Sequence, residues 1–134
     1  MVTKNSYFWL FLICPGIMAK IEHITTRSQL AKILVTQPVV IKFSAEYCGP
    51  CRASRAMFER LSNQETYKNI RFIEVDVEQG NSLAHEYKIK GIPAFVFVKN
   101  GQAVDFELGY NGINSEKAIV KKLDKLTDRT TKNN

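Results

Sequence analysis

Two cysteines separated by two residues, Cys48-Gly49-Pro50-Cys51, form the stretch of this sequence with the clearest chemistry. They follow an apolar run at 39–43 that is typical of a buried strand, and they precede a helix-forming run at 52–61. The spacing therefore predicts a strand-to-helix turn with Cys48 at the start of the helix. Unpaired backbone N–H groups and the helix dipole favour a thiolate there, and the thiolate is the attacking species in thiol–disulfide exchange.

The two intervening residues suit the same chemistry. They let Cys51 reach the sulfur of Cys48, so that a mixed disulfide formed at Cys48 can be resolved within the chain. Pro50 falls in the first helical turn, where a missing N–H costs little, and Gly49 keeps the approach open. We predict that Cys48 is the nucleophile and Cys51 the resolving thiol.

Two other uses of the cysteine pair fit less well. Zinc needs about four ligands, usually from two such pairs, and the remaining candidates, Cys14, His23 and His85, are not paired at ligand spacing. A purely structural disulfide across so short a loop would remove little entropy from the unfolded chain. Redox chemistry is the favoured interpretation.

The segment at 43–51, FSAEYCGPC, resembles the active site of the thioredoxin family. The segment at 91–94, GIPA, resembles the cis-proline loop of that family, and Asn100-Gly101 and Gly109 match its later turns. The resemblance covers residues 21–126. It implies an α/β thioredoxin fold, a central mixed β-sheet with helices on both faces, and it implies a protein dithiol–disulfide oxidoreductase without a metal or bound organic cofactor.

The resemblance also implies a substrate site. It places Pro93 opposite the cysteine pair, after a cis peptide bond, where the backbone can bind an extended substrate segment. A trans proline that starts a strand is the alternative. Tyr47, Ile92 and Tyr110 would line a shallow apolar surface, with Tyr47 standing where the family usually has tryptophan.

Three positions depart from the family pattern. Lys42 replaces a buried aspartate thought to help deprotonate the second cysteine, Phe72 replaces its partner lysine, and Ala56 replaces the proline that kinks the active-site helix. Without that proline we expect a straighter helix. Because Phe72 offers Lys42 no counter-charge, we expect Lys42→Met to leave the fold intact or to stabilise it.

The role of Lys42 stays open at this point. Glu46 or a water molecule could replace the missing aspartate. Lys42 could itself act as a base if burial lowers its pKa, or as a cation that favours the Cys51 thiolate. Alternatively, its amine reaches solvent and has no catalytic part.

Hydrophobic periodicity predicts the elements that position these residues. Alternation and apolar runs indicate strands at 21–24, 39–45, 70–76, 94–98 and 102–108. Helices are expected at 26–35, 52–61 with a further turn through 67, 81–87 and 114–126, the first with a Thr26/Gln29 capping box and the third capped by Asn81. Asn100-Gly101 indicates a hairpin turn. Right-handed crossovers then give a mixed sheet covered on both faces.

Composition fits one domain with a substantial core. The chain has 134 residues, 45% hydrophobic and 24% charged, and its three cysteines are too few for a disulfide-stapled secreted scaffold. The net charge is +6, or +5 without residues 1–19 (18 basic against 13 acidic). A basic cluster on the last helix lacks any nucleic-acid motif and is interpreted as a solvated face (Lys121, Lys122 and Lys125).

The chain divides into three parts: 1–19, a thioredoxin domain at 20–126, and a polar tail at 127–134. Residues 1–19 are either a signal peptide cleaved after Ala19 or a stretch upstream of a true start at Met18. The second interpretation gives a cytoplasmic protein and is the one we expect; the first gives an exported one.

The sequence therefore predicts a protein-disulfide reductase that acts through Cys48 and Cys51. Its partners would be disulfide-containing proteins and, by resemblance, a thioredoxin-reductase-like electron donor that uses flavin and nicotinamide. We expect a monomer without nucleic-acid or membrane partners. The alternative is a thioredoxin-fold binding or stabilising subunit whose redox chemistry is dispensable.

Overall fold

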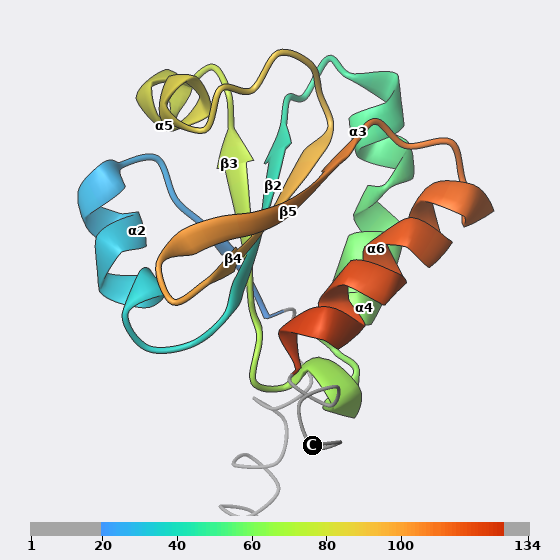
Figure 1. Cartoon of the computed structure of the whole chain (residues 1–134). Coiled ribbons are helices and arrows are strands. Elements are labelled where there is room, and N and C mark those ends of the chain that lie inside the picture. Colours follow the sequence, from blue (N-terminus) through green and yellow to red (C-terminus); the bar gives the residue numbers. More distant parts are fainter. Residues whose placement is uncertain (1–19, 128–134) are drawn as a thin grey trace, which may run out of the picture.

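The computed structural model describes residues 20–127, and a five-stranded mixed sheet runs through its centre (Figure 1). The first three strands of the chain are parallel to one another, the fourth is antiparallel to them, and the fifth is antiparallel to the fourth. This confirms the predicted topology. The strands lie in the order β1 (Ile21–His23), β3 (Arg71–Asp76), β2 (Val39–Ser44), β4 (Ala94–Lys99) and β5 (Gln102–Leu108).

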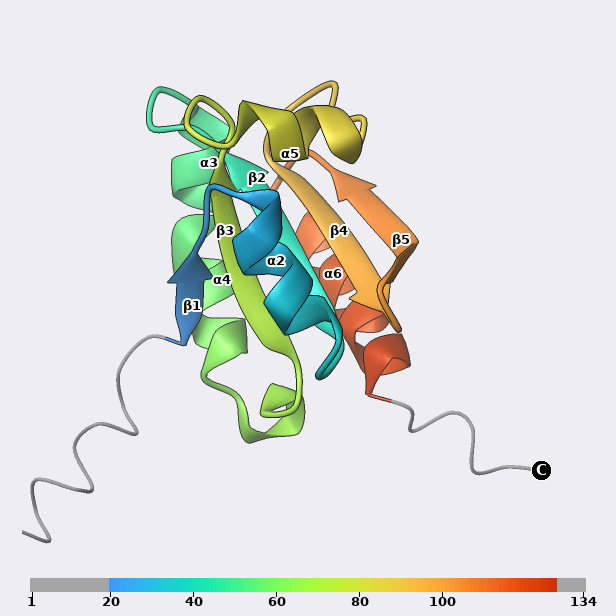
Figure 2. The same cartoon turned by 90° about the vertical axis from the view of Figure 1, so that its left-hand side faces the viewer.

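Helices cover both faces of the sheet, as predicted (Figures 1 and 2). One face carries α2 (Arg27–Leu34) and α5 (Asn81–Glu86). The other carries α3 (Gly49–Ala53), α4 (Arg55–Ser62) and α6 (Ile113–Leu126), and a short 3-10 helix, η2 (Glu65–Tyr67), leads into β3. No helix within residues 20–127 is long and apolar enough to cross a membrane.

Strand β2 is buried along its whole length because its two faces belong to two cores. Ile41 and Phe43 point toward α2 and α5, whereas Val40 packs with Phe58 beneath α4 and α6. Burial of this kind explains the nearly continuous apolar run in the sequence. Lys42 is the one charged residue of the strand, and it lies on the face of Val40.

Local signals set most element ends. At α2, the Gln29 N–H donates to Thr26 Oγ1 (3.2 Å) and the Thr26 N–H donates to Gln29 Oε1 (3.1 Å), so the capping box is confirmed. The predicted cap at Asn81 is wrong, because Gly80 occupies that position and Asn81 is already helical. A Cβ on Gly80 would lie 2.7 Å from the Val75 side chain.

The helix after the cysteines does not run straight, which corrects the expectation drawn from Ala56. It starts at Gly49 and divides at Ser54 into α3 and α4. The carbonyl of Cys51 accepts hydrogen bonds from Ser54 Oγ (2.9 Å) and Lys42 Nζ (3.1 Å). Side-chain donors thus occupy this carbonyl, and the helix divides without proline.

The predictions for residues 1–19 and 128–134 lie outside the described residues.

Candidate active site

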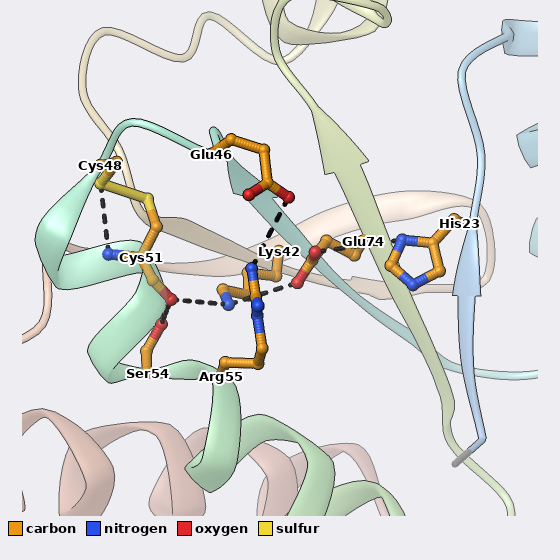
Figure 3. Close-up of polar contacts among 8 residues, drawn as sticks. All are labelled: His23, Lys42, Glu46, Cys48, Cys51, Ser54, Arg55 and Glu74. Carbon is orange, nitrogen blue, oxygen red and sulfur yellow. Dashed lines mark hydrogen bonds and ion pairs between the residues drawn. A yellow bond between two sulfur atoms is a disulfide. The ribbon is translucent and has the colours of Figure 1, made fainter. Parts of the chain in front are cut away.

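Cys48 and Cys51 lie at the turn from β2 into α3, with their sulfurs at disulfide-bonding distance and their Cα atoms 5.2 Å apart (Figure 3). Cys48 is the N-cap of α3, and its sulfur accepts a hydrogen bond from the Cys51 N–H (3.2 Å). The predicted place of Cys48 at a helix start is confirmed. This donor is one of the groups that can stabilise a negative charge on the Cys48 sulfur.

The two cysteines differ in exposure. Cys48 is 9% exposed and Cys51 is 3% exposed, whereas Gly49 and Pro50 between them lie at the surface. No atom lies within 4 Å of the place where a Cβ on Gly49 would stand, so the approach is open. Cys48 is therefore the more accessible of the two cysteines.

The loop before β4 lies against the cysteine pair. The Ile92–Pro93 peptide bond is cis, as predicted, and the Ile92 carbonyl oxygen lies 3.8 Å from the Cys48 sulfur. The Pro93 carbonyl accepts a hydrogen bond from the Gly109 N–H (2.7 Å), which ties this loop to the end of β5. Ile92 also packs against the small cluster that contains both cysteines.

The two predicted tyrosines lie in different places. Tyr47 precedes Cys48 directly and is largely exposed, so its ring is available to a partner. Tyr110 is half-buried and packs against the core cluster beneath α4 and α6. The structure thus groups Tyr47, Ile92 and Pro93 around the cysteines, and the contact of Tyr110 with substrate remains a prediction.

Lys42 does not reach solvent, so the interpretation in which its amine is solvated is wrong. Its side chain is 1% exposed, and Nζ lies 3.1 Å from the Cys51 carbonyl oxygen and 3.2 Å from Glu74 Oε2 (Figure 3). Nζ also lies 5.7 Å from the centre of the Phe58 ring. Burial lowers the pKa of Lys42, while the charge of Glu74 and its hydrogen bond to the amine act in the opposite direction.

The counter-charge of Lys42 is Glu74, a residue that the sequence analysis missed. Phe72, the expected partner position, pairs instead with Val40 and lies in the core. β2 and β3 are parallel strands of six residues each, and Lys42 and Glu74 are each the fourth residue. The strand predicted at 70–76 begins one residue before β3, so counting along the predicted strands would have paired Lys42 with Ile73 instead of Glu74. The family pattern has an aspartate at position 42 and a lysine at position 72. In this chain the basic residue, Lys42, is on β2 and the acidic residue, Glu74, is on β3.

Glu46, the other candidate to replace the aspartate, lies at the surface. Its side chain is 84% exposed, and Oε1 lies 3.8 Å from Arg55 NH2 (Figure 3). Between Glu46 and Glu74 is a cavity of about 200 Å³ that reaches Cys51. Polar and charged groups dominate its wall, among them Lys42, Glu46, Arg55, Glu74 and Asp76.

Within residues 20–127, no three histidine, cysteine or acidic side chains are grouped so that they could hold a metal ion.

Comparison with known proteins agrees with this geometry. A sequence profile described as thioredoxin matches residues 20–125. The thioredoxin of Mycoplasmoides gallisepticum is 35% identical over 101 residues, which are 75% of this chain and 99% of that protein. Thioredoxin-3 of Dictyostelium discoideum is 40% identical over 94 residues, 70% of this chain and 88% of that protein. The solved thioredoxin of Malassezia sympodialis has a TM-score of 0.69 and 32% identity, covering 79% of this chain and 93% of that one. The chain belongs to the thioredoxin family.

Proposed function

We propose that Cys48 attacks substrate disulfides and that Cys51 resolves the mixed disulfide that results. The chain is a protein dithiol–disulfide oxidoreductase of the thioredoxin family. The Cys48 thiolate bonds to one substrate sulfur, and the other substrate sulfur leaves with the electron pair of the broken bond. The Cys51 thiolate then bonds to Cys48, the first substrate sulfur leaves reduced, and the two cysteines end as a disulfide.

One observation carries the assignment of roles. Cys48 is both the more exposed of the two cysteines and the N-cap of α3, where the Cys51 N–H points at its sulfur. Both features favour attack at Cys48, since a nucleophile must be accessible and its thiolate stabilised. Cys51 is more deeply buried and lies within bonding distance of Cys48.

The proposed substrate surface consists of Tyr47, Ile92, Pro93 and Tyr110. Its support is the position of the Ile92–Pro93 segment beside the Cys48 sulfur and the exposure of the Tyr47 ring. An extended substrate strand can pair with the backbone beside Pro93 while its apolar side chains contact Tyr47.

Insulin reduction with dithiothreitol as the electron source tests the function. We expect the wild-type protein to precipitate insulin chains rapidly and Cys48→Ser to be no faster than dithiothreitol alone. Wild-type protein without activity in this assay would contradict the reductase and leave a binding role.

Thioredoxin-family proteins act on disulfide substrates together with reductase partners. For this chain we infer a flavin- and nicotinamide-dependent reductase as donor, and a monomer in the cytoplasm without nucleic-acid or membrane partners. The location depends on translation from Met18. Mass spectrometry of the native N-terminus tests it, and a chain that starts at Lys20 in an exported fraction would contradict it.

A further inference from the structure

We propose that Glu74 accepts the proton that Cys51 loses in the resolving step, while Lys42 exchanges Glu74 for the Cys51 thiolate as its counter-ion. This inference rests on the proposed role of Cys51 as the resolving thiol. It gives a role to a residue outside the cysteine motif and to a charged residue that is buried within a strand.

The resolving step needs a local base. Cys51 is 3% exposed, so bulk water has little access to its thiol. Its own N–H donates a hydrogen bond to the Cys48 sulfur, and its carbonyl accepts hydrogen bonds from Lys42 and Ser54. A thiol in such surroundings gives up its proton readily only if an acceptor and a nearby positive charge are provided.

An ammonium and a carboxylate lie together beside the main chain of Cys51. Lys42 Nζ lies between the Cys51 carbonyl oxygen (3.1 Å) and Glu74 Oε2 (3.2 Å), and all three residues line the cavity of about 200 Å³ (Figure 3). The Glu74 side chain is 16% exposed, and its other oxygen lies 3.9 Å from Nδ1 of the exposed His23. Glu74 therefore connects the buried end of the cavity with solvent.

The step balances in protons and electrons. The Cys51 S–H bond breaks, and its proton crosses the cavity to the Glu74 carboxylate. The Lys42 ammonium keeps its charge throughout and now pairs with the thiolate, so the site holds one positive and one negative charge before and after. The thiolate electron pair forms the bond to Cys48, the substrate sulfur leaves reduced, and Glu74 returns the proton to solvent.

Other charged groups surround the pair without replacing Glu74. Arg55 on α4 disfavours a charged Lys42 and Glu59 on the same helix favours it, but both act at a distance. Glu46 is turned toward Arg55 and is largely exposed. The groups that face the cavity from β1, β2, β3, α4 and the loop before α3 are His23, Lys42, Glu74, Asp76, Arg55 and Glu46.

Stopped-flow kinetics with a dye-labelled disulfide peptide can separate attack from resolution. We expect Glu74→Gln to slow resolution at least about tenfold at neutral pH; a well-positioned base can contribute ~100-fold. Attack by Cys48 should be unchanged. The deficit should shrink as pH rises, because hydroxide then deprotonates Cys51 directly. Glu46→Gln is the matched control and should leave both steps unchanged.

Unchanged or faster resolution in Glu74→Gln would overturn the inference, since Lys42 would then act by its charge alone. A second variant, Lys42→Glu/Glu74→Lys, keeps one carboxylate and one ammonium in the cavity. It should resolve faster than Glu74→Gln, and equal slowness would also overturn the inference. If the wild-type protein reduces insulin while Glu74→Gln resolves normally, only this inference fails and the proposed function stands.

Discussion

At the scale of single residues, Cys48 and Cys51 have different surroundings although only two residues separate them. Cys48 caps α3 at the surface, and Cys51 lies under it beside a buried ion pair. We expect iodoacetamide to label Cys48 well before Cys51 in the reduced protein at neutral pH, as followed by peptide mass spectrometry. Equal labelling, or Cys51 first, would reverse the roles.

A second experiment tests the same assignment through the intermediate. Cys51→Ser removes the resolving thiol, so mixed disulfides between Cys48 and substrates should accumulate. Non-reducing electrophoresis after mixing with a disulfide-containing protein would reveal them, and Cys48→Ser is the control that should form none.

The Lys42–Glu74 pair changes what Lys42→Met should do. The sequence suggested a harmless or stabilising change, but the substitution leaves a poorly exposed carboxylate without its partner. Breaking a buried ion pair costs about 3–5 kcal/mol, and the partial exposure of Glu74 reduces this to about 1–3 kcal/mol. Urea denaturation should show this loss for Lys42→Met and a smaller one for Lys42→Met/Glu74→Gln. A single variant as stable as the double would mean that the pair is not formed in solution.

The stability of the protein should also depend on pH through Lys42. Burial lowers the pKa of this amine below its ordinary value of 10.5. The folded state therefore binds fewer protons than the unfolded state between the lowered pKa and 10.5, so the free energy of unfolding rises with pH across that window. The difference in the free energy of unfolding between wild type and Lys42→Met, measured from neutral pH to about 10, isolates this contribution. We expect this difference to shift in favour of the wild type as pH rises.

At the scale of elements, an ion pair connects the two long helices on the active-site face. Arg60 on α4 donates to both carboxylate oxygens of Glu116 on α6, at 2.9 and 3.1 Å. The hydrogen bond from Arg60 lowers the pKa of Glu116 below its ordinary value of 4.5. Its contribution to stability is therefore present above that value and is lost as pH falls through the lowered pKa.

We accordingly expect Glu116→Gln to destabilise the protein modestly at neutral pH and to have no effect well below pH 4.5. Thermal unfolding of both proteins across this range is the measurement. Glu78→Gln, which removes an exposed carboxylate away from α4 and α6, should show no such pH-dependent difference. An effect of Glu116→Gln that persists in acid would have to come from packing.

At the scale of the whole molecule, the edge strand β5 is a part of the sheet through which two copies of the chain could pair, so its side chains affect the oligomeric state. Val104, Phe106 and Leu108 are large apolar residues exposed on this strand. Lys122 donates to the Phe106 carbonyl (2.8 Å) and also pairs with Glu107, which places charge along the edge. Charged edges oppose strand pairing between molecules, so we expect sedimentation analysis to show a monomer at micromolar concentration.

Most of the fold could be predicted because strand and helix periods are local properties of the sequence. The hairpin at Asn100 and the α2 capping box are set by a few adjacent residues and were found. The division of the helix at Ser54 and the partner of Lys42 depend on contacts between distant segments, which periodicity does not contain. The cysteine motif located the reactive atoms, but the groups beneath them required the register of β2 against β3.

The cavity behind Cys51 has one more consequence. None of Tyr47, Ile92, Pro93 or Tyr110 lines it, so the cavity and the proposed substrate surface share none of these residues. In the proposed mechanism, the substrate protein and the proton therefore use different parts of the site. The rate of the resolving step should then depend little on the size of the bound partner, so that a bulky folded protein and a short peptide should be resolved at similar rates.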